Sequence, residues 1–347
     1  MKTRLAFLCL VSILLLILAP FALASTTWYV DGANGNDGNN CKTRQTACKT
    51  IEHAISLALS GDTIGIGPAT YTENLTIGIS LRIIGSGAPS TIIDGGGFNT
   101  VVVISTEGAN VTLSKVTIRN GRGNYGGGIS NLGTLTINSS TITGNIASDG
   151  GAMELWYGGT ATINNSTIAA NSASYNGGGI ESSGPVTINN STISGNSATY
   201  GGGVDLTHGG TATINNSTIA ANSSGIISFD GSSATFQNSI LANNTGGNCS
   251  GTTISTGYNL SSDNTCNFNG AGDMNNTNAK LGNLGNHGGP TQTIPLLEGS
   301  PAIDAGNPNG CTDGNGHLLK IDQRGYPRPD KEDTGGCDMG AYERQSD

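Results

Sequence analysis

The most constraining feature of this sequence is a segment that repeats nearly unchanged from Leu113 to Asn222, with looser copies on either side. Copies such as TATINNSTIAAN close with an asparagine, and the closing asparagines are spaced 25, 26, 25, 26 and 22 residues apart. These residues are Asn120, Asn145, Asn171, Asn196, Asn222 and Asn244. A fixed period in this range indicates one supersecondary unit per repeat, stacked on its neighbours.

Each repeat has the pattern of β-strands. Apolar residues alternate with small polar ones, as in Thr162, Ile163 and Asn164, which is the period of two expected for a strand. Thr, Ile and Val dominate, Gly, Asn and Ser punctuate, and a repeat of this length leaves no room for a crossover helix. We therefore predict an all-β fold, a parallel β-solenoid in which each coil adds about 4.8 Å, the strand spacing.

Equivalent residues of successive coils are expected to stack into ladders. Two inward apolar ladders follow from the alignment: Ile118, Ile142, Ile168, Ile193, Ile219 and Leu241, and Leu113, Ile137, Ile163, Ile188, Ile214 and Phe236. The closing asparagines, Asn120 included, are predicted to form an asparagine ladder whose amides hydrogen-bond from coil to coil.

Composition and the N-terminus narrow the class of protein. The chain has 55 Gly and 11% charged residues, which suits many tight turns and not a helical globular enzyme. Residues 1–24 have the basic end, apolar core and small-residue cleavage site of a secretory signal peptide; an uncleaved anchor helix is the alternative. No second apolar span follows, so we expect an exported protein, extracellular or at the cell surface or outer membrane, with no transmembrane span in the mature chain.

The charge balance bears on partners. Removal of residues 1–24 takes away Lys2 and Arg4 and no acidic residue, which leaves 13 basic against 24 acidic residues and a net charge of −11. Nucleic acid is therefore not an expected partner, because its phosphate backbone would be repelled.

The six cysteines outside residues 1–24 fall in three close pairs. Pairing within each pair is the expected disulfide pattern of an exported chain: Cys41–Cys48, Cys249–Cys266 and Cys311–Cys337. A zinc site is the alternative, but the cysteine spacings and the four scattered His form no ligand motif.

The chain divides into a leader and three structural segments. Residues 25–60 are expected to form a strand, a loop and a helix over 50–59 that covers the first coil, because an open coil end exposes unpaired strand groups. Residues 61–256 form the coils, and residues 257–347, where the period is lost, form an irregular C-terminal cap pinned by a disulfide. With both ends covered, we expect a monomer.

Three segments resemble known families. CKTIEHAISLALSGDTIGIGPATYTENLTI (48–77) resembles the opening of bacterial right-handed parallel β-helix proteins of the pectin-lyase-like superfamily. The middle coils, with I-x-x-N-x-A after each glycine cluster, resemble polymorphic outer-membrane protein repeats, with Ile where those repeats usually carry Phe. Residues 281–308 and 322–343 resemble the C-terminal module of choice-of-anchor Q surface proteins. Together they imply a right-handed β-helix protein of the cell surface.

One acidic constellation has a predictable geometry. In the strands that follow the glycine clusters, Ile129, Met153, Ile180 and Val204 should point inward. The next residues then form an outward column, which we name the carboxylate column: Ser130, Glu154, Glu181 and Asp205. Two residues further on, Trp156, Ser183 and Thr207 form a second outward column, with His208 at the end of its strand. Adjacent members of a column lie about 4.8 Å apart.

The carboxylate column has three interpretations. Glu154, Glu181 and Asp205 are candidate catalytic residues of a glycoside hydrolase, because adjacent coils suit the retaining arrangement and alternate coils the inverting one. They are equally candidate ligands of Ca²⁺. On an open, solvated face they would do neither. The candidate substrate-binding residues around them are Trp156, Ser130, Thr207 and His208.

The superfamily resemblance implies polyuronide lyase activity, but this activity does not suit the distribution of basic residues in the sequence. Polyuronide lyases commonly use a basic side chain as general base, yet no Lys or Arg occurs between Arg122 and Lys280. We therefore predict a structural, adhesive or glycan-binding module that binds polysaccharide or cell-surface glycans. The alternative is a polysaccharide-active enzyme, a glycoside hydrolase rather than a lyase.

Overall fold

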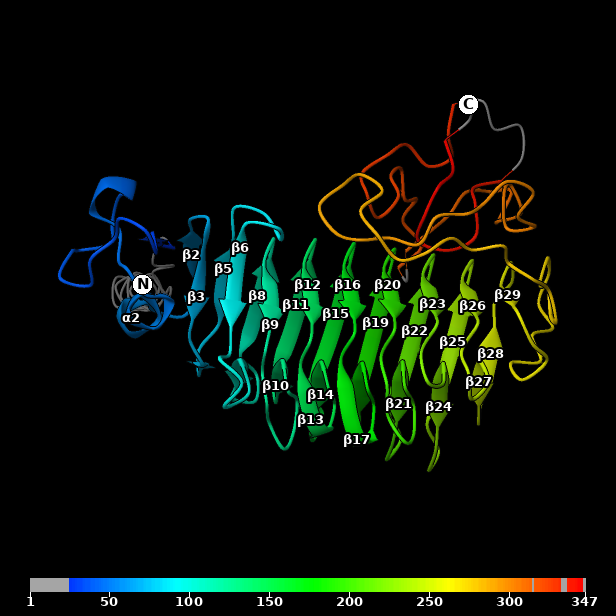
Figure 1. The fold of residues 1–347 in the computed structure, drawn as a ribbon, viewed down its shortest axis with the longest axis horizontal. Helices are drawn as coiled ribbons and strands as arrows, with labels where there is room; N and C mark the ends of the chain where they lie inside the picture. Colours follow the sequence, from blue (N-terminus) through cyan, green and yellow to red (C-terminus); the bar gives the residue numbers. More distant parts are fainter. Residues whose placement is uncertain (1–24, 314, 332–335, 346–347) are drawn as a thin grey trace, which may run out of the picture.

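The chain forms an elongated parallel β-solenoid (Figure 1). The computed structural model describes residues 25–313, 315–331 and 336–345, so the predicted signal peptide lies outside the described residues. Three sheets of 10, 9 and 8 strands run along the solenoid, and each coil contributes one strand to each sheet in turn. The predicted all-β solenoid is confirmed.

The three sheets have the following strands. The first contains β1 (Thr27–Val30), β2 (Asp62–Ile66), β5 (Leu81–Ile84), β8 (Asn110–Ser114), β11 (Thr134–Asn138), β15 (Thr160–Asn164), β19 (Pro185–Asn189), β22 (Thr211–Asn215), β25 (Ser233–Gln237) and β28 (Thr253–Ser255). The second contains β3 (Ala69–Thr72), β6 (Thr91–Asp94), β9 (Thr117–Arg119), β12 (Thr141–Thr143), β16 (Thr167–Ala169), β20 (Thr192–Ser194), β23 (Thr218–Ala220), β26 (Ile240–Ala242) and β29 (Leu260–Ser261). The third contains β4 (Leu75–Ile77), β7 (Val102–Ile104), β10 (Ile129–Asn131), β14 (Met153–Leu155), β18 (Ile180–Ser182), β21 (Val204–Leu206), β24 (Ile226–Ser228) and β27 (Cys249–Ser250). A two-stranded sheet, β13 (Ile146–Asp149) and β17 (Ser172–Asn176), lies beside them.

The apolar ladders form the core. Ile163 pairs with Ile137 on one side and Ile188 on the other, and the register continues to Phe236. Ile168 likewise pairs with Ile142 and Ile193. These side chains are at most 1% exposed, and each buried one stabilises the fold by about 1.5–3 kcal/mol. Both predicted ladders are confirmed, and this stacking explains why the sequence repeats.

The asparagine ladder is confirmed from Asn145 to Asn244. In each step the amide oxygen of one asparagine accepts from the backbone N–H and the side-chain amide of the preceding one, as Asn196 does from Asn171 at 3.0 Å each. The prediction is wrong for Asn120, which aligns with Gly144 because Arg119 pairs with Thr143. Asn120 occupies the left-handed turn position, with φ 55°, and its amide donates to Asp94.

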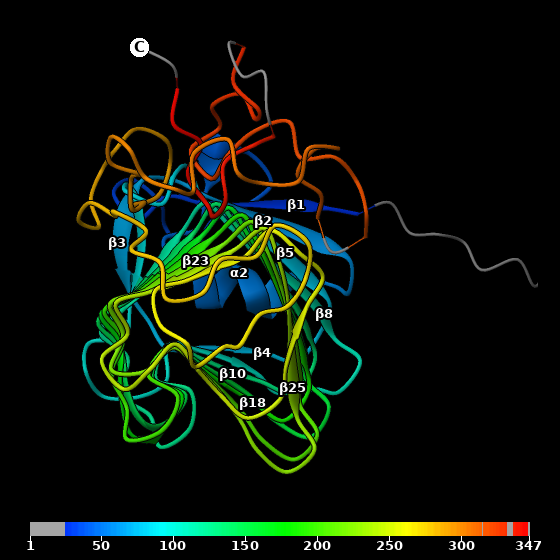
Figure 2. The same ribbon diagram turned by 90° about the vertical axis from the view of Figure 1, so that its right-hand side faces the viewer.

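A short helix covers the first coil. Helix α2 (Ile51–Leu57) begins after Thr50, whose hydroxyl accepts from the His53 backbone N–H at 3.3 Å, and follows the 3-10 turn η1 (Arg44–Thr46). Ile51 and Ala54 are fully buried against the coil. Viewed along the solenoid, α2 lies within the outline of the coils (Figure 2). The helix is shorter than predicted: Ala58 ends it with an extended backbone, and Leu59 is 64% exposed.

The last coil is covered by the segment that holds the Cys249–Cys266 disulfide. Phe268, 5% exposed, joins the core there and packs against Phe236 with ring centroids 5.2 Å apart. Disulfides also join Cys41 to Cys48 and Cys311 to Cys337.

Beyond that segment the C-terminal part folds back along the second sheet (Figure 1). Gln323 donates to Thr167 of β16 at 2.9 Å and accepts from Thr192 of β20 at 2.6 Å. The backbone N–H of Ala341 donates to Thr218 of β23 at 3.1 Å. The C-terminal segment therefore covers the flank of several coils as well as the end of the last one. None of the helices in the described residues has the length and apolar character of a membrane span.

Candidate functional site

The carboxylate column aligns as the repeat predicts. Glu154 of β14 pairs with Ser130 of β10 and with Glu181 of β18, which pairs with Asp205 of β21. Their strand neighbours Met153, Ile180 and Val204 are fully buried in the core. Alternation along a strand therefore directs the carboxylates away from the core, toward the outside of the third sheet.

Beside this column is a cavity of about 430 Å³, which we call the cleft. Of the predicted site residues, the lining includes Glu154, Trp156, Glu181, Ser183, Thr207 and His208. Ser130 and Asp205 do not line it. The lining also includes Tyr125, Asp149, Leu155, Tyr157, Gly158 and Asn176.

The carboxylates do not lie on an open face. Glu154 is 3% exposed and Asp205 is fully buried, so the solvated-face interpretation is wrong for these two residues. The glycine clusters cause this burial. A Cβ on Gly150 would lie 2.7 Å from the Glu154 Cβ, and one on Gly201 would lie 2.5 Å from the Asp205 Cβ. Only glycine lets the preceding turn pass so close to each carboxylate side chain.

Glu154 and Glu181 form an acidic pair joined by a hydrogen bond. Burial raises the pKa of Glu154 well above its usual range, and the Glu181 charge and a hydrogen bond with Glu181 add to this effect. Burial also raises the pKa of Glu181, while the hydrogen bonds from Glu154 and Thr207 oppose the rise. The Thr207 hydroxyl donates to Glu181 Oε1 at 3.1 Å. The hydrogen bond between them raises the pKa of Glu154 and lowers that of Glu181, so a proton shared by the pair resides on Glu154.

Asp205 is a buried acid without a hydrogen-bond partner on either carboxylate oxygen. Burial, followed by the charges of Glu181 and Asp149, raises its pKa to about 7. Because it does not line the cleft, it influences a bound molecule only through its charge.

Aromatic rings form one wall of the cleft, which we call the aromatic wall: Tyr125, Trp156 and Tyr157. Trp156 meets Tyr125 edge-on, with ring centroids 4.7 Å apart, and stacks on Tyr157 at 5.3 Å. Tyr157 is 80% exposed. His208 is an exposed turn residue with φ 50° on the lining of the cleft.

The sequence does contain a signal for the lining residues that were not predicted. Tyr125, Asp149 and Asn176 each directly precede a glycine cluster, and Tyr200 does so in the next coil. The structure pairs Tyr125 with Asp149, Asp149 with Asn176, and Asn176 with Tyr200. These four residues form a further stacked column, distinct from that of Trp156, Ser183 and Thr207. It runs parallel to the carboxylate column, and the glycine turn of each coil joins the two.

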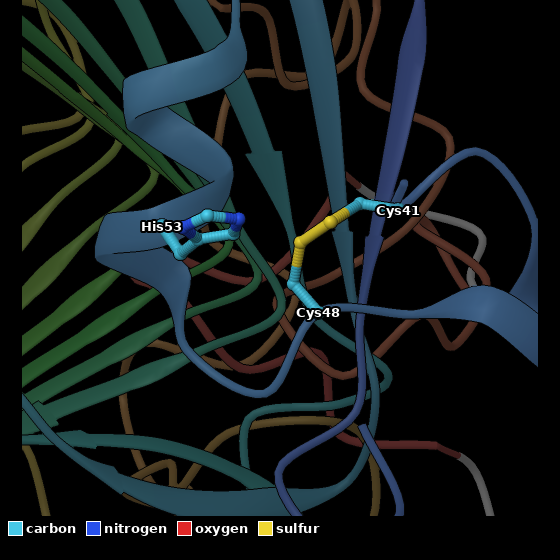
Figure 3. A group of neighbouring side chains, drawn as sticks. All are labelled: Cys41, Cys48 and His53. Atoms are coloured by element: carbon cyan, nitrogen blue, oxygen red, sulfur yellow. A yellow bond between two sulfur atoms is a disulfide. The ribbon is translucent and has the colours of Figure 1, made fainter. Parts of the chain in front are cut away.

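No metal site is assembled from the predicted ligands. Among the described residues, the one group of three acidic, His or Cys side chains whose ligand atoms lie within 4.8 Å of one another is Cys41, Cys48 and His53 (Figure 3). The two sulfurs are bonded to each other as a disulfide, so they do not serve as thiolate ligands. Glu154, Glu181 and Asp205 are not gathered this closely, and Ca²⁺ binding by them stays a prediction.

The family is decided by a match over more than half of the chain. A family model described as "Right handed beta helix region" matches residues 100–284. The chain belongs to this right-handed β-helix family. The crystal structure of a pectate lyase matches this β-helix with a TM-score of 0.51 and 14% identity, covering 93% of this chain and 98% of that one.

A pectin methylesterase from Erwinia chrysanthemi matches with a TM-score of 0.39 and 12% identity, over 61% of this chain and 80% of that one. At 14% identity, the likeness to the pectate lyase shows the β-helix fold alone. No curated protein matches the sequence.

The cleft of this β-helix combines two chemical functions. The aromatic wall offers ring surface on which a sugar can stack. The adjacent acidic pair places a proton on Glu154 beside the acceptor Glu181, and general acid–base chemistry requires a proton donor and an acceptor.

Proposed function

We propose that this right-handed β-helix protein binds glycans in the cleft. The observation that carries the proposal is that the aromatic wall and buried carboxyls line the same cavity of about 430 Å³. The ring faces bury the apolar side of a sugar, and the carboxyl oxygens of Glu181 accept hydrogen bonds from its hydroxyls. Small-ligand sites usually combine a cavity lined by aromatic and apolar side chains with a few polar groups that point into it.

A binding panel with two matched variants tests the proposal. Soluble oligosaccharides of neutral, acidic and amino sugars are titrated into the protein by calorimetry. Trp156→Ala should weaken binding of the ligand found by at least about tenfold, because an aromatic stacking contact is removed. Phe98→Ala removes an aromatic ring that is 80% exposed and lies outside the cleft, and should leave binding unchanged. Absence of binding across the panel, or binding that survives Trp156→Ala, would refute the proposal.

Hydrolysis of the bound glycan is the second candidate, and the acidic pair favours it. Glu154 would act as general acid and Glu181 as its partner, on adjacent strands; their mutual hydrogen bond would have to open so that a glycosidic bond lies between the two carboxyls, as a retaining glycoside hydrolase requires. Lyase chemistry is disfavoured because no Lys or Arg lines the cleft. A reducing-end assay tests this candidate: Glu154→Gln and Glu181→Gln should each abolish turnover, and turnover that persists in both variants would remove it.

Export and surface location complete the proposal. The predicted signal peptide at 1–24, the three disulfides and the resemblance to choice-of-anchor Q and polymorphic outer-membrane protein sequences support a secreted or cell-surface protein. In this view residues 61–256 carry the glycan site, while residues 25–60 and 257–347 protect the ends and flank of the solenoid. Fractionation of the native host, with the protein found in the cytoplasm, would contradict it.

A further inference from the structure

The cleft has more hydrogen-bond acceptors than the protein satisfies. Asp149, Glu154 and Glu181 line it, and neither Lys nor Arg is among its lining residues. Asn176 donates to Asp149 Oδ1 at 2.9 Å, and Thr207 donates to Glu181 Oε1 at 3.1 Å. Glu154, 3% exposed, keeps its Oε2 atom buried without a partner. The carboxyls of Asp149 and Glu181 accept few hydrogen bonds from the protein, so a ligand that brings donors is favoured.

The charges and rings select one kind of donor. An ammonium group has three N–H donors and no acceptor, which matches a cleft with surplus acceptors. The faces of Tyr125, Trp156 and Tyr157 attract a cation through their ring quadrupoles, most strongly at Trp. Resting on the glycan-binding function proposed above, we infer that the sugar held in this cleft carries a free protonated amine, as in a glucosamine oligosaccharide.

Other sugar classes fit less well. A uronic acid adds a carboxylate to a cleft that already holds several carboxyls and has neither Lys nor Arg among its lining residues to pair with that charge. An N-acetylated sugar loses the charge and brings a carbonyl acceptor where acceptors are already in excess. A neutral sugar supplies hydroxyl donors but gains nothing from the charges of Asp149 and Glu181.

Calorimetric titration with tetrasaccharides of equal length tests the inference. The probes are the glucosamine tetramer, its N-acetylated form, cellotetraose and tetragalacturonate. We expect the glucosamine tetramer to bind at least about tenfold more tightly than cellotetraose, because hydrogen bonds between charged groups are stronger than those between neutral groups. The difference should shrink in high salt, which screens charges. Tetragalacturonate should bind most weakly.

Three variants separate charge from fold. Asp149→Asn and Glu181→Gln keep the shape of the cleft and should reduce the preference for the amine, measured in each variant as the ratio of glucosamine-tetramer to cellotetraose affinity, about fivefold or more. Asp230→Asn, which alters an exposed aspartate in the turn after β24, is the control and should leave the preference unchanged. Circular dichroism of each variant checks that the solenoid is intact.

The outcomes distinguish this inference from the function on which it rests. Equal affinity for the glucosamine and neutral tetramers, or tighter binding of the N-acetylated or galacturonate probe, would overturn the inference and leave glycan binding standing. A preference unchanged in both Asp149→Asn and Glu181→Gln would also overturn it. Binding of none of the four probes, together with no binding in the wider polysaccharide panel, would overturn both.

Discussion

Replacement of Asp205 by asparagine should make the protein more stable at neutral and alkaline pH than the wild type. Asp205 is fully buried, and neither oxygen has a hydrogen-bond partner. Burial, with the charges of Glu181 and Asp149, raises its pKa from 3.8 to about 7. Asparagine has nearly the same shape and never ionises, so it avoids the cost of burying a charge.

The direction and magnitude of this change in stability with pH follow from proton linkage. The folded state keeps the proton at pH values where the unfolded chain has lost it, so the contribution of Asp205 to stability falls as pH rises from about 4 to about 7. With the pKa of Asp205 raised to about 7, the free energy of unfolding of the wild type should fall by about 2 kcal/mol relative to that of Asp205→Asn between pH 5 and pH 7. Between pH 7 and pH 9 it should fall by less than about 0.5 kcal/mol more.

Urea unfolding monitored by circular dichroism at pH 5, 7 and 9 measures this difference. Asp230→Asn, at an exposed turn aspartate, is the matched control and should follow the wild type at every pH. Parallel pH profiles for the wild type and Asp205→Asn would refute the reasoning, because they would mean that Asp205 ionises as easily in the folded state as in the unfolded chain.

Three further predictions concern the solenoid and its covers. Asn196→Ala should lower the free energy of unfolding by about 3 kcal/mol, because Asn171 donates to Asn196 from both its backbone and its side chain, and both buried donors lose their acceptor. Phe268→Ala should cost about 3–5 kcal/mol by uncovering the ring of Phe236. Replacing Cys311 and Cys337 by serine should cost about 3–4 kcal/mol and raise hydrogen exchange in the C-terminal segment before the coils.

Each of these has a contradicting result. A loss within about 0.5 kcal/mol for Asn196→Ala would mean that water or a neighbour replaces the ladder. For Phe268→Ala, unchanged exchange in β25 and β28 would mean that the last coil is covered by something else. For the disulfide variant, exchange that rises uniformly along the solenoid would show that the C-terminal segment and the coils unfold as one unit.

The carboxylate column illustrates how far periodicity reaches. A period of two along each strand and about 4.8 Å between strands suffices to stack Glu154, Glu181 and Asp205 in register. Periodicity says nothing about what lies above a face. The burial of Glu154 depends on the path of the turn at Gly150, and the exclusion of Asp205 from the cleft depends on the turn at Gly201.

Asn120 shows the limit of sequence alignment within the repeat. Its type matches the ladder asparagines, but hydrogen bonding of β9 with β12 sets the register, and it places Gly121 opposite Asn145. A shift of one residue moves a side chain to another environment. Asn120 consequently serves a turn and bonds to Asp94.

The sequence by itself determined the solenoid, its apolar ladders and the alignment of the carboxylates, because these follow from local spacing that recurs in every coil. It also indicated the disulfide pairs, because the cysteines fall in three close pairs. Only the tertiary structure decided that Glu154 and Glu181 share a proton, that the aromatic wall lines the same cavity, and that the C-terminal segment lies along the second sheet. The physical reason is that these features arise from turns and side chains that differ between coils, and their contacts form only when the coils are stacked and the chain ends fold against them.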